Sequence, residues 1–278
     1  VLTDFIDNAP DQFSDATYSA MRERSVGLGV MGLHSYFQKK NIPLESVMSK
    51  VWNNKIFKNI QKNVDNSSKK LAEERGACPD ASDYGINERF SNKTAIAPTA
   101  SISIICGGTS PGVEPVAANS YTHKTLSGSF NVKNKYLEKI LEKYKKNTDE
   151  IWSSITTNQG SVMHLDFLTK EEKDVFKTAF ELDQRWIVDL GADRTPHISQ
   201  AQSINIFIPA DIHKKDLHQI HFQAWKKGLK SLYYCRSKSI QRAENINSGS
   251  STDVTKNVYK SEADDSNQND YEECLSCQ

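Results

Sequence analysis

The sequence predicts an α/β fold with parallel strands, on the evidence of two units in which a strand leads into a helix. The first unit is 93–105 (KTAIAPTASISII), which predicts a strand ending at Pro98 and a helix beginning near Thr99. The second unit combines an apolar run (SINIFIP, 203–209), a helical segment (DLHQIHFQAWKKG, 216–228) and a β-rich run (LKSLYY). A strand, a helix and a second strand in this order are typical of a βαβ unit, whose strands are parallel.

Three segments show the apolar period of an amphipathic helix. The first is KYLEKILEKYKK (135–146), and the second follows Thr169 and Glu172, which form a capping box. The third is the helix of the βαβ unit, which ends at Gly228, a typical residue after a helix C-terminus. The three predicted apolar stripes are Leu137, Ile140, Leu141 and Tyr144; Val175, Phe176, Ala179 and Phe180; and Leu217, Ile220, Ala224 and Trp225.

The composition divides the chain into two parts. Residues 1–236 have the composition of a globular protein, and residues 237–278 are predicted to be a flexible tail. The tail is rich in Ser, Asn, Asp and Lys, with too few apolar side chains to offset the entropy of ordering. Within it, residues 237–273 would form a flexible coil of about 37 residues that spans roughly 30 to 35 Å, enough to cross the face of a domain.

Charge and cysteine content exclude several classes of protein. The 35 basic and 35 acidic residues balance, so no global field favours nucleic acid or an anionic membrane. No stretch approaches the roughly 18 apolar residues of a membrane span, and the N-terminus lacks a signal-peptide pattern, which predicts a cytoplasmic protein. Five cysteines with irregular spacing predict reduced thiols. The start at Val1 predicts either methionine removal or a piece of a longer chain.

The segment 97–115 (APTASISIICGGTSPGVEP) carries the most specific candidate for a ligand site. At a helix start here, the backbone N–H groups of residues 99–103 point out of the helix N-terminus. The hydroxyls of Thr99, Ser101 and Ser103 stand beside them, so neutral donors could hold a phosphate without any lysine. The alternative, that these hydroxyls only cap the helix, remains equally open from the residues alone.

Tyr233 and Tyr234 are predicted to end the second strand of the βαβ unit. Chemistry in α/β proteins gathers at the C-terminal ends of strands. Two adjacent phenols could pass an electron and a proton together, because a neutral phenol with a pKa near 10 must lose its proton on oxidation. The alternative is a pair of ordinary strand residues, since tyrosine favours strands.

The chain ends in YEECLSCQ, in which Cys274 and Cys277 are three residues apart. Two thiolates are too few for a structural zinc site, which takes four ligands. A cysteine pair at this spacing forms a disulfide readily, and a mobile linker would carry it to a buried site for thiol exchange. A chance cysteine pair at a flexible end is the alternative.

Two further patterns are weaker. The segment 27–32 (GLGVMG) matches the glycine spacing of a dinucleotide-binding loop, but the polar, helical segment 15–25 precedes it where a strand is needed. These glycines are therefore predicted to allow close helix packing. His218 and His221 share a helix face without a carboxylate or cysteine at ligand spacing, so no metal site is predicted.

Several segments together resemble one enzyme family. The chain is similar over nearly its whole length to the C-terminal part of the large, catalytic subunit of class I ribonucleotide reductase. The segments that carry the resemblance are RERSVGLGVMGL, RGACP, IAPTASIS followed by GVEP, YTHKTLSGSF, QAQSINIFI, HFQAWKKGLKSLYYCRS and the closing CLSC. The resemblance implies that residues 1–236 form the C-terminal half of a ten-stranded α/β barrel.

The resemblance also implies roles for particular residues. The stretch Thr99, Ala100, Ser101, Ile102 and Ser103 corresponds to the part that binds the substrate diphosphate. The pair Tyr233 and Tyr234 looks like the last stage of the radical path from the small subunit. The pair Cys274 and Cys277 is similar to the C-terminal pair that reduces the active-site disulfide and is itself reduced by thioredoxin or glutaredoxin.

The implied activity is the reduction of ribonucleoside diphosphates to 2'-deoxyribonucleoside diphosphates by radical chemistry for DNA synthesis. The family's thiyl-radical cysteine, the two cysteines that reduce the ribose and the sites for ATP and dNTP effectors would precede Val1. No cofactor or metal is expected on this chain, because the radical comes from a metal-containing small subunit. Cys235 stands where the family usually has no thiol, and its role is left open.

Half a barrel exposes two strand edges and an apolar interior, so the chain is expected to act with an N-terminal part of the large subunit. The alternative function is a non-catalytic, reductase-like scaffold that binds phosphate. Loss of the tyrosine pair or of the tail cysteines would favour the scaffold, and both pairs are present.

Overall fold

The computed structural model describes residues 6–125 and 128–237. The predicted tail at 238–278 therefore lies outside the described residues, as do Cys274 and Cys277. In chain order the elements are η1 (Asp11–Phe13), α2 (Ser14–Glu23), α3 (Leu33–Lys39), α4 (Val47–Arg75), α5 (Pro79–Asp83), α6 (Ala100–Ile105), β1 (Ser120–Thr125), β2 (Gly128–Lys133), α7 (Lys135–Lys143), α8 (Asp149–Thr157), α9 (Lys170–Val175), α10 (Gln184–Arg194), η2 (Thr195–His197), β3 (Ile206–Ile208), α11 (Lys214–Lys226) and β4 (Cys235–Ser237).

Parallel pairing joins four extended segments in a row. β3 and β4 are parallel, with Ile206 opposite Cys235, and α11 connects them, which confirms the predicted βαβ unit. Single parallel bridges join Leu28 to Thr94 and Ile96 to Gln202. The predicted strand at 93–98 therefore pairs at these two positions only, and the helix after it begins at Ala100, close to the predicted start.

The tyrosine pair lies at the start of the last strand, so the prediction that it ends this strand was wrong. The backbone N–H of Tyr233 donates to the Ile204 carbonyl (2.9 Å), and that of Ile206 donates to the Tyr234 carbonyl (2.9 Å). Pairing then continues through β4 to Ser237. The strand is displaced along the sequence because the preceding run 229–232 is a connection whose leucines pack onto the core.

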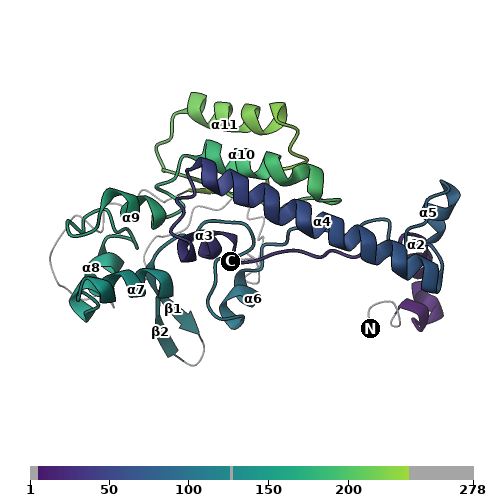
Figure 1. Cartoon of the computed structure of the whole chain (residues 1–278), viewed down its shortest axis with the longest axis horizontal. Coiled ribbons are helices and arrows are strands. Elements are labelled where there is room, and N and C mark those ends of the chain that lie inside the picture. Colours follow the sequence, from purple (N-terminus) through teal and green to yellow (C-terminus); the bar gives the residue numbers. More distant parts are fainter. Residues whose placement is uncertain (1–5, 126–127, 238–278) are drawn as a thin grey trace, which may run out of the picture.

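The strands β1 and β2 form an antiparallel hairpin, with Ser120 opposite Lys133 and Tyr121 opposite Val132. The sequence does not predict this hairpin, because its first strand, SYTHKT, lacks the alternation of apolar and polar residues that indicates a strand. Figure 1 places the hairpin beside α7, at the end of the molecule that also holds α8 and α9.

The long helix α4 forms the spine of the molecule, with α10 and α11 along one side and α2 and α5 at its far end (Figure 1). Arg194 of α10 is buried where α10, α4 and the sheet meet. Its Nε donates to Gln202 (2.5 Å), its Nη1 donates to Asn53 (3.4 Å), and its guanidinium lies 5.8 Å from the Phe57 ring centre. Burial lowers the pKa of Arg194 to about 9. The resulting contacts tie α10 to both neighbours.

The predicted helices are confirmed where the apolar residues repeat over enough turns to define one buried face. Leu137 and Leu141 of α7 are fully buried, and the capping box of α9 is present. However, α9 ends at Val175, so the last three residues of its predicted stripe lie beyond the helix. On α11, Ala224 is buried but Trp225 is 73% exposed, so its predicted core position was wrong. Consecutive helical residues point about 100° apart, and the buried stripe is too narrow to include both.

The glycines of GLGVMG serve a different purpose from the one predicted. A Cβ on Gly29 would lie 2.6 Å from the Ala95 carbonyl oxygen, and the neighbouring Leu28 bridges to Thr94. Glycine is therefore needed here for the close approach of two extended segments, and the prediction of helix packing was wrong.

Across the described ranges 6–125 and 128–237, no helix combines the length and the apolar character that a bilayer span requires.

Candidate functional site

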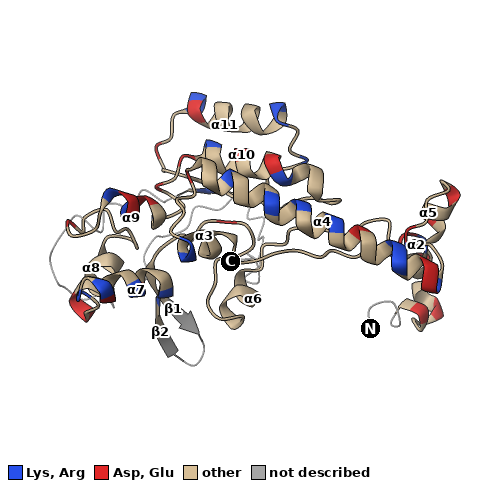
Figure 2. Cartoon of the chain, in the orientation of Figure 1, with Lys and Arg blue, Asp and Glu red and all other residues tan. Residues whose placement is uncertain are grey.

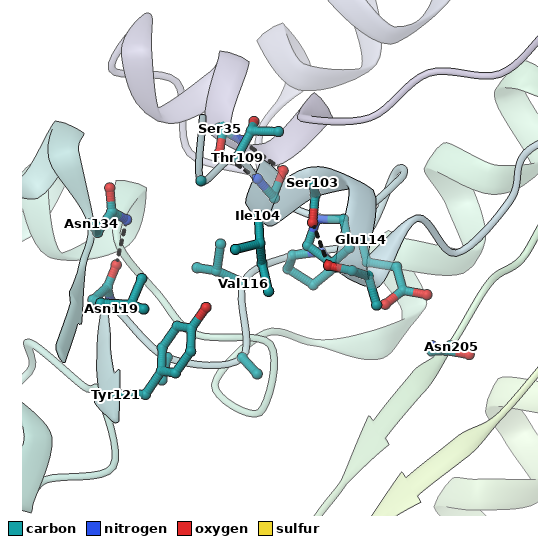
Figure 3. Close-up of a pocket in the computed structure, with 18 of the residues that line it drawn as sticks. Ser35, Ser103, Ile104, Thr109, Glu114, Val116, Asn119, Tyr121, Asn134 and Asn205 are labelled. Carbon is teal, nitrogen blue, oxygen red and sulfur yellow. Dashed lines mark hydrogen bonds between the residues drawn. The ribbon is translucent and has the colours of Figure 1, made fainter. Parts of the chain in front are cut away.

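A cavity of about 430 Å³ lies between α6, the loop that follows it, the hairpin and the parallel sheet (Figure 3). Its wall combines an apolar surface with a few polar side chains from distant parts of the sequence. Prominent lining residues are Ala100, Ser103 and Ile104 of α6, Glu114 and Val116 of the following loop, Tyr121 of β1, Asn205, and Arg236 of β4. A mixed wall of this kind is typical of a small-molecule site.

The start of α6 offers backbone donors without any charged side chain. The N–H groups of Ala100, Ser101 and Ile102 belong to the first turn, which has no acceptor within the helix. The Ser103 N–H donates to the Thr99 carbonyl (2.9 Å) and closes that turn. Figure 2 shows no acidic or basic residue on α6. Any anion bound there would be held by neutral donors.

Thr99 connects α6 to the loop that closes the cavity. Its φ is +54°, in the left-handed region, and its Oγ1 accepts a hydrogen bond from the Gly112 N–H at 2.7 Å. Gly112 also has a positive φ (+48°), and a Cβ there would lie 2.9 Å from the Ala97 carbonyl oxygen. The loop therefore sits directly against the chain that leads into α6.

The five residues predicted to bind phosphate divide into three groups. Ala100 and Ser103 line the cavity, and Ser103 is 2% exposed with its hydroxyl donating to the Ala100 carbonyl (2.9 Å). Ser101 and Ile102 are exposed. Thr99 holds the loop and does not cap α6 with its side chain, contrary to the alternative that Thr99 serves as a cap.

Glu114 is a buried acidic residue of the cavity wall that the sequence did not predict as a site residue. Its side chain is 7% exposed, and burial raises its pKa to about 7, against the opposing effects of a hydrogen bond with Asn205 and the charge of Arg236. The motif GVEP contains this residue, but nothing local indicates that its carboxyl is buried. Only the folding of β3 and β4 against the loop creates that environment.

The tyrosine pair lies next to the same wall. The rings of Tyr233 and Tyr234 are 4.1 Å apart between centres and inclined by 47°. The Tyr234 N–H donates to Asn205 Oδ1 at 3.0 Å, and the Arg236 guanidinium lies 5.8 Å from the Tyr234 ring centre. Since Asn205 and Arg236 both line the cavity, the tyrosine pair is separated from the cavity by a single layer of side chains.

Comparisons with known proteins agree with this arrangement. The family model described as ribonucleotide reductase, barrel domain, matches residues 1–88 and 80–235. The chain belongs to the ribonucleotide reductase barrel family. It is 48% identical over 251 residues to the ribonucleoside-diphosphate reductase large subunit of Invertebrate iridescent virus 6, covering 89% of this chain and 26% of that protein. The corresponding subunit of Invertebrate iridescent virus 3 is 44% identical over 255 residues, covering 91% and 40%.

A solved structure supports the same fold. The class Id ribonucleotide reductase alpha subunit of Actinobacillus ureae matches with a TM-score of 0.79 and 40% identity, covering 85% of this chain and 44% of that one. The four parallel segments are therefore part of a ribonucleotide reductase barrel. The chain spans between 26% and 44% of the length of these three relatives.

Other polar candidates take no part in the cavity of this reductase barrel. Cys78 is buried, and Cys106 and Cys235 are exposed. His221 Nδ1 lies 2.9 Å from the Leu217 carbonyl oxygen, and His218 stacks on a phenylalanine. Within the described part of the chain, no group of three or more His, Cys, Asp or Glu side chains is placed to hold a metal ion.

Replacement of Thr99 tests how the reductase barrel holds α6 in place. The substitution Thr99→Val keeps the side-chain shape but leaves the Gly112 N–H without its acceptor. We expect it to lower the free energy of unfolding by about 1–2 kcal/mol. Thr99→Ser retains the hydroxyl and should stay close to the parent in denaturant unfolding. Equal behaviour of the two variants would contradict this role.

A buried imidazole contacts the loop of the cavity. His34 of α3 is 1% exposed, and its Nδ1 accepts a hydrogen bond from the Val116 N–H (3.1 Å). Burial lowers the pKa of His34 to about 4. Its neighbour Ser35 exchanges hydrogen bonds with Ser110, from backbone N–H to hydroxyl in both directions (3.1 and 2.9 Å). The reciprocal bonds fasten α3 to the loop of the cavity.

His34 should make the reductase barrel sensitive to acid. Between its ordinary pKa of 6.5 and its folded value of about 4, the unfolded chain binds a proton that the folded chain does not. The contribution of neutral His34 to the free energy of unfolding is therefore fully present above pH 6.5. This contribution is lost as the pH falls through 4, and the loss reaches up to about 3 kcal/mol. His34→Asn keeps an acceptor without this titration, so its stability relative to the parent should rise over that range in denaturant unfolding. Exposed His221→Asn is the control and should leave the acid slope unchanged.

Proposed function

We propose that this chain supplies the C-terminal part of the catalytic subunit of a ribonucleoside-diphosphate reductase. The complete enzyme would reduce ribonucleoside diphosphates to 2'-deoxyribonucleoside diphosphates by radical chemistry, for DNA synthesis. Two viral relatives named as ribonucleoside-diphosphate reductase large subunits support this proposal. The single observation that carries it is the cavity in which the first turn of α6 and the residues that hold Tyr234 share one wall.

The substrate diphosphate would bind at the stretch Thr99, Ala100, Ser101, Ile102 and Ser103. Phosphate oxygens are strong acceptors, and the open N–H groups of the first turn of α6 are donors without an internal partner. The absence of charge on α6 favours binding through hydrogen bonds from fixed donors over a single ion pair. The apolar parts of the cavity wall would then surround the nucleoside.

Tyr233 and Tyr234 would form the last stage of the radical path. Each phenol gives up an electron and its proton together, and regains both when the radical moves on. The 4.1 Å spacing of the two rings suits transfer between them without an intervening group. A metal-containing small subunit would generate the radical, and the thiyl-radical cysteine would come from the N-terminal part of the large subunit.

The tail cysteines would restore the enzyme after each turnover. Reduction of the ribose releases its 2'-hydroxyl as water and converts two thiols from the N-terminal part into a disulfide. The thiolate of Cys274 or Cys277 would attack that disulfide, so the active-site thiols return and the tail pair becomes oxidised. The dithiol of thioredoxin or glutaredoxin would then reduce the tail. A flexible tail over 237–278, in the cytoplasm, fits this exchange.

A reconstitution assay tests the proposal. The chain is combined with the N-terminal part of the large subunit, the small subunit and thioredoxin, and deoxyribonucleotide formation is measured for all four ribonucleoside diphosphates with ATP and dNTP effectors. We expect turnover only when every component is present. If the assembled mixture binds diphosphates but never forms product, the chain is a phosphate-binding scaffold. If the chain does not associate with the N-terminal part, the proposal fails.

A further inference from the structure

Three polar side chains meet at one end of the cavity, and two of them keep a buried atom without a hydrogen-bond partner. Glu114 comes from the loop after α6, Asn205 precedes β3, and Arg236 belongs to β4. Glu114 is 7% exposed and Asn205 is 1% exposed. Among the described residues, Glu114 Oε1 and Arg236 Nε are buried without a hydrogen-bond partner. Such atoms are rare in folded proteins and call for an explanation, of which a functional role is one.

Asn205 and Arg236 are also the two residues that hold Tyr234. Asn205 Oδ1 accepts the Tyr234 N–H at 3.0 Å and fixes the backbone there. The Arg236 guanidinium lies 5.8 Å from the ring centre and restricts the ring itself. The side chain of Glu114 extends from the loop toward the segment that carries Asn205 (Figure 3). Glu114 therefore interacts with both residues that contact Tyr234.

We propose that Glu114 is a positioning residue for Tyr234, acting through Asn205 and Arg236. A hydrogen bond between Glu114 and Asn205 holds the amide in the orientation that accepts the Tyr234 N–H. The carboxyl also attracts the Arg236 guanidinium and so keeps it over the ring. This role rests on the proposed function, because a fixed Tyr234 ring matters for transfer between the two phenols.

The placement explains why a carboxyl is kept in a costly environment. Burial raises the pKa of Glu114 to about 7, so the protein gives up stability to keep this group at the cavity wall. An apolar side chain would fill the same space at no such cost. Neither the start of α6 nor the hairpin needs this carboxyl for its own hydrogen bonds.

Fluorine NMR of the full chain labelled with 3-fluorotyrosine tests the role without any catalysis. The sequence contains 10 tyrosines, and Tyr234→Phe identifies the signal of Tyr234. We expect Glu114→Ala to shift or broaden that signal, and Glu114→Gln to move it less, because glutamine can still bond to Asn205. Glu45→Gln is the matched control, since this carboxyl is 18% exposed and pairs with Lys177 away from the cavity. It should leave the Tyr234 signal in place.

Kinetics of the reconstituted enzyme give the second measurement. Glu114→Gln should lower kcat by about tenfold, with a smaller effect on KM for the diphosphate, because the substitution keeps the side-chain shape and acts on Tyr234 through Asn205 and Arg236. An unchanged Tyr234 signal in both Glu114 variants would overturn the positioning role. If Glu114→Ala unfolds the chain, all tyrosine signals will merge. The Tyr234 signal of Glu114→Gln then tests the positioning role by itself. Absence of turnover in the parent would instead count against the proposed function and leave the NMR result standing.

Discussion

Tyr233→Phe and Tyr234→Phe are each expected to reduce turnover of the reconstituted enzyme by more than about a thousandfold. A loss of this size corresponds to an increase of about 4 kcal/mol in the activation free energy. A phenyl ring has no proton to release, so its oxidation leaves a cation in place of a neutral radical. The rings lie 4.1 Å apart, and removal of either hydroxyl would interrupt the proposed radical path while leaving the packing almost unchanged. The measurement is the rate of deoxyribonucleotide formation.

Substrate binding separates this effect from a structural one. Neither tyrosine is among the residues that line the cavity, so the dissociation constant for a ribonucleoside diphosphate should stay within about twofold of the parent. Tyr144→Phe is the matched control, because its hydroxyl contacts Glu172 at 3.0 Å and neither residue lines the cavity. Retained turnover in Tyr233→Phe or Tyr234→Phe would remove the proposed relay.

Cys274→Ser and Cys277→Ser should each stop turnover that depends on thioredoxin. Thiol exchange needs both sulfurs, one to attack the active-site disulfide and one to release the mixed disulfide. With either one replaced, the enzyme should complete a single turnover and then stall. A small dithiol that reaches the active site directly should restore repeated turnover. The rates with the two reductants, measured side by side, test this prediction.

One of the two residues between the cysteines offers the control. Ser276→Ala changes the same part of the tail without touching a thiol, so it should retain turnover with thioredoxin. An equal loss of activity with thioredoxin and with the small dithiol in Cys274→Ser would indicate a structural role for the pair. The described residues end before this part of the chain, so its prediction depends on the sequence alone.

The parts of the fold that the sequence predicts are those that depend on neighbours along the chain. The stripe of α7 and the capping box of α9 follow from spacings of three and four residues, and both are present. The βαβ unit around α11 was predicted for the same reason. The hairpin and the exposure of Trp225 depend on which surfaces meet in the folded molecule. No local pattern contains that information.

The candidate site divides in the same way. The start of α6 follows from the change in residue pattern at Thr99, and the resemblance to a known family adds its role. The buried state of Glu114 and the environment of His34 arise from segments far apart in the sequence. In the sequence, both residues look like ordinary surface residues. Glu114 is buried only when β3 and β4 pack against its loop, and His34 only when α3 packs against the same loop.

A crystal structure of the completed catalytic subunit with a bound ribonucleoside diphosphate tests the central claim most directly. Phosphate oxygens should lie within about 3 Å of the N–H groups of Ala100, Ser101 and Ile102, with the ribose on the side of the cavity nearest Tyr233 and Tyr234. A diphosphate bound away from α6, or a ribose separated from the tyrosines by intact protein, would contradict the account.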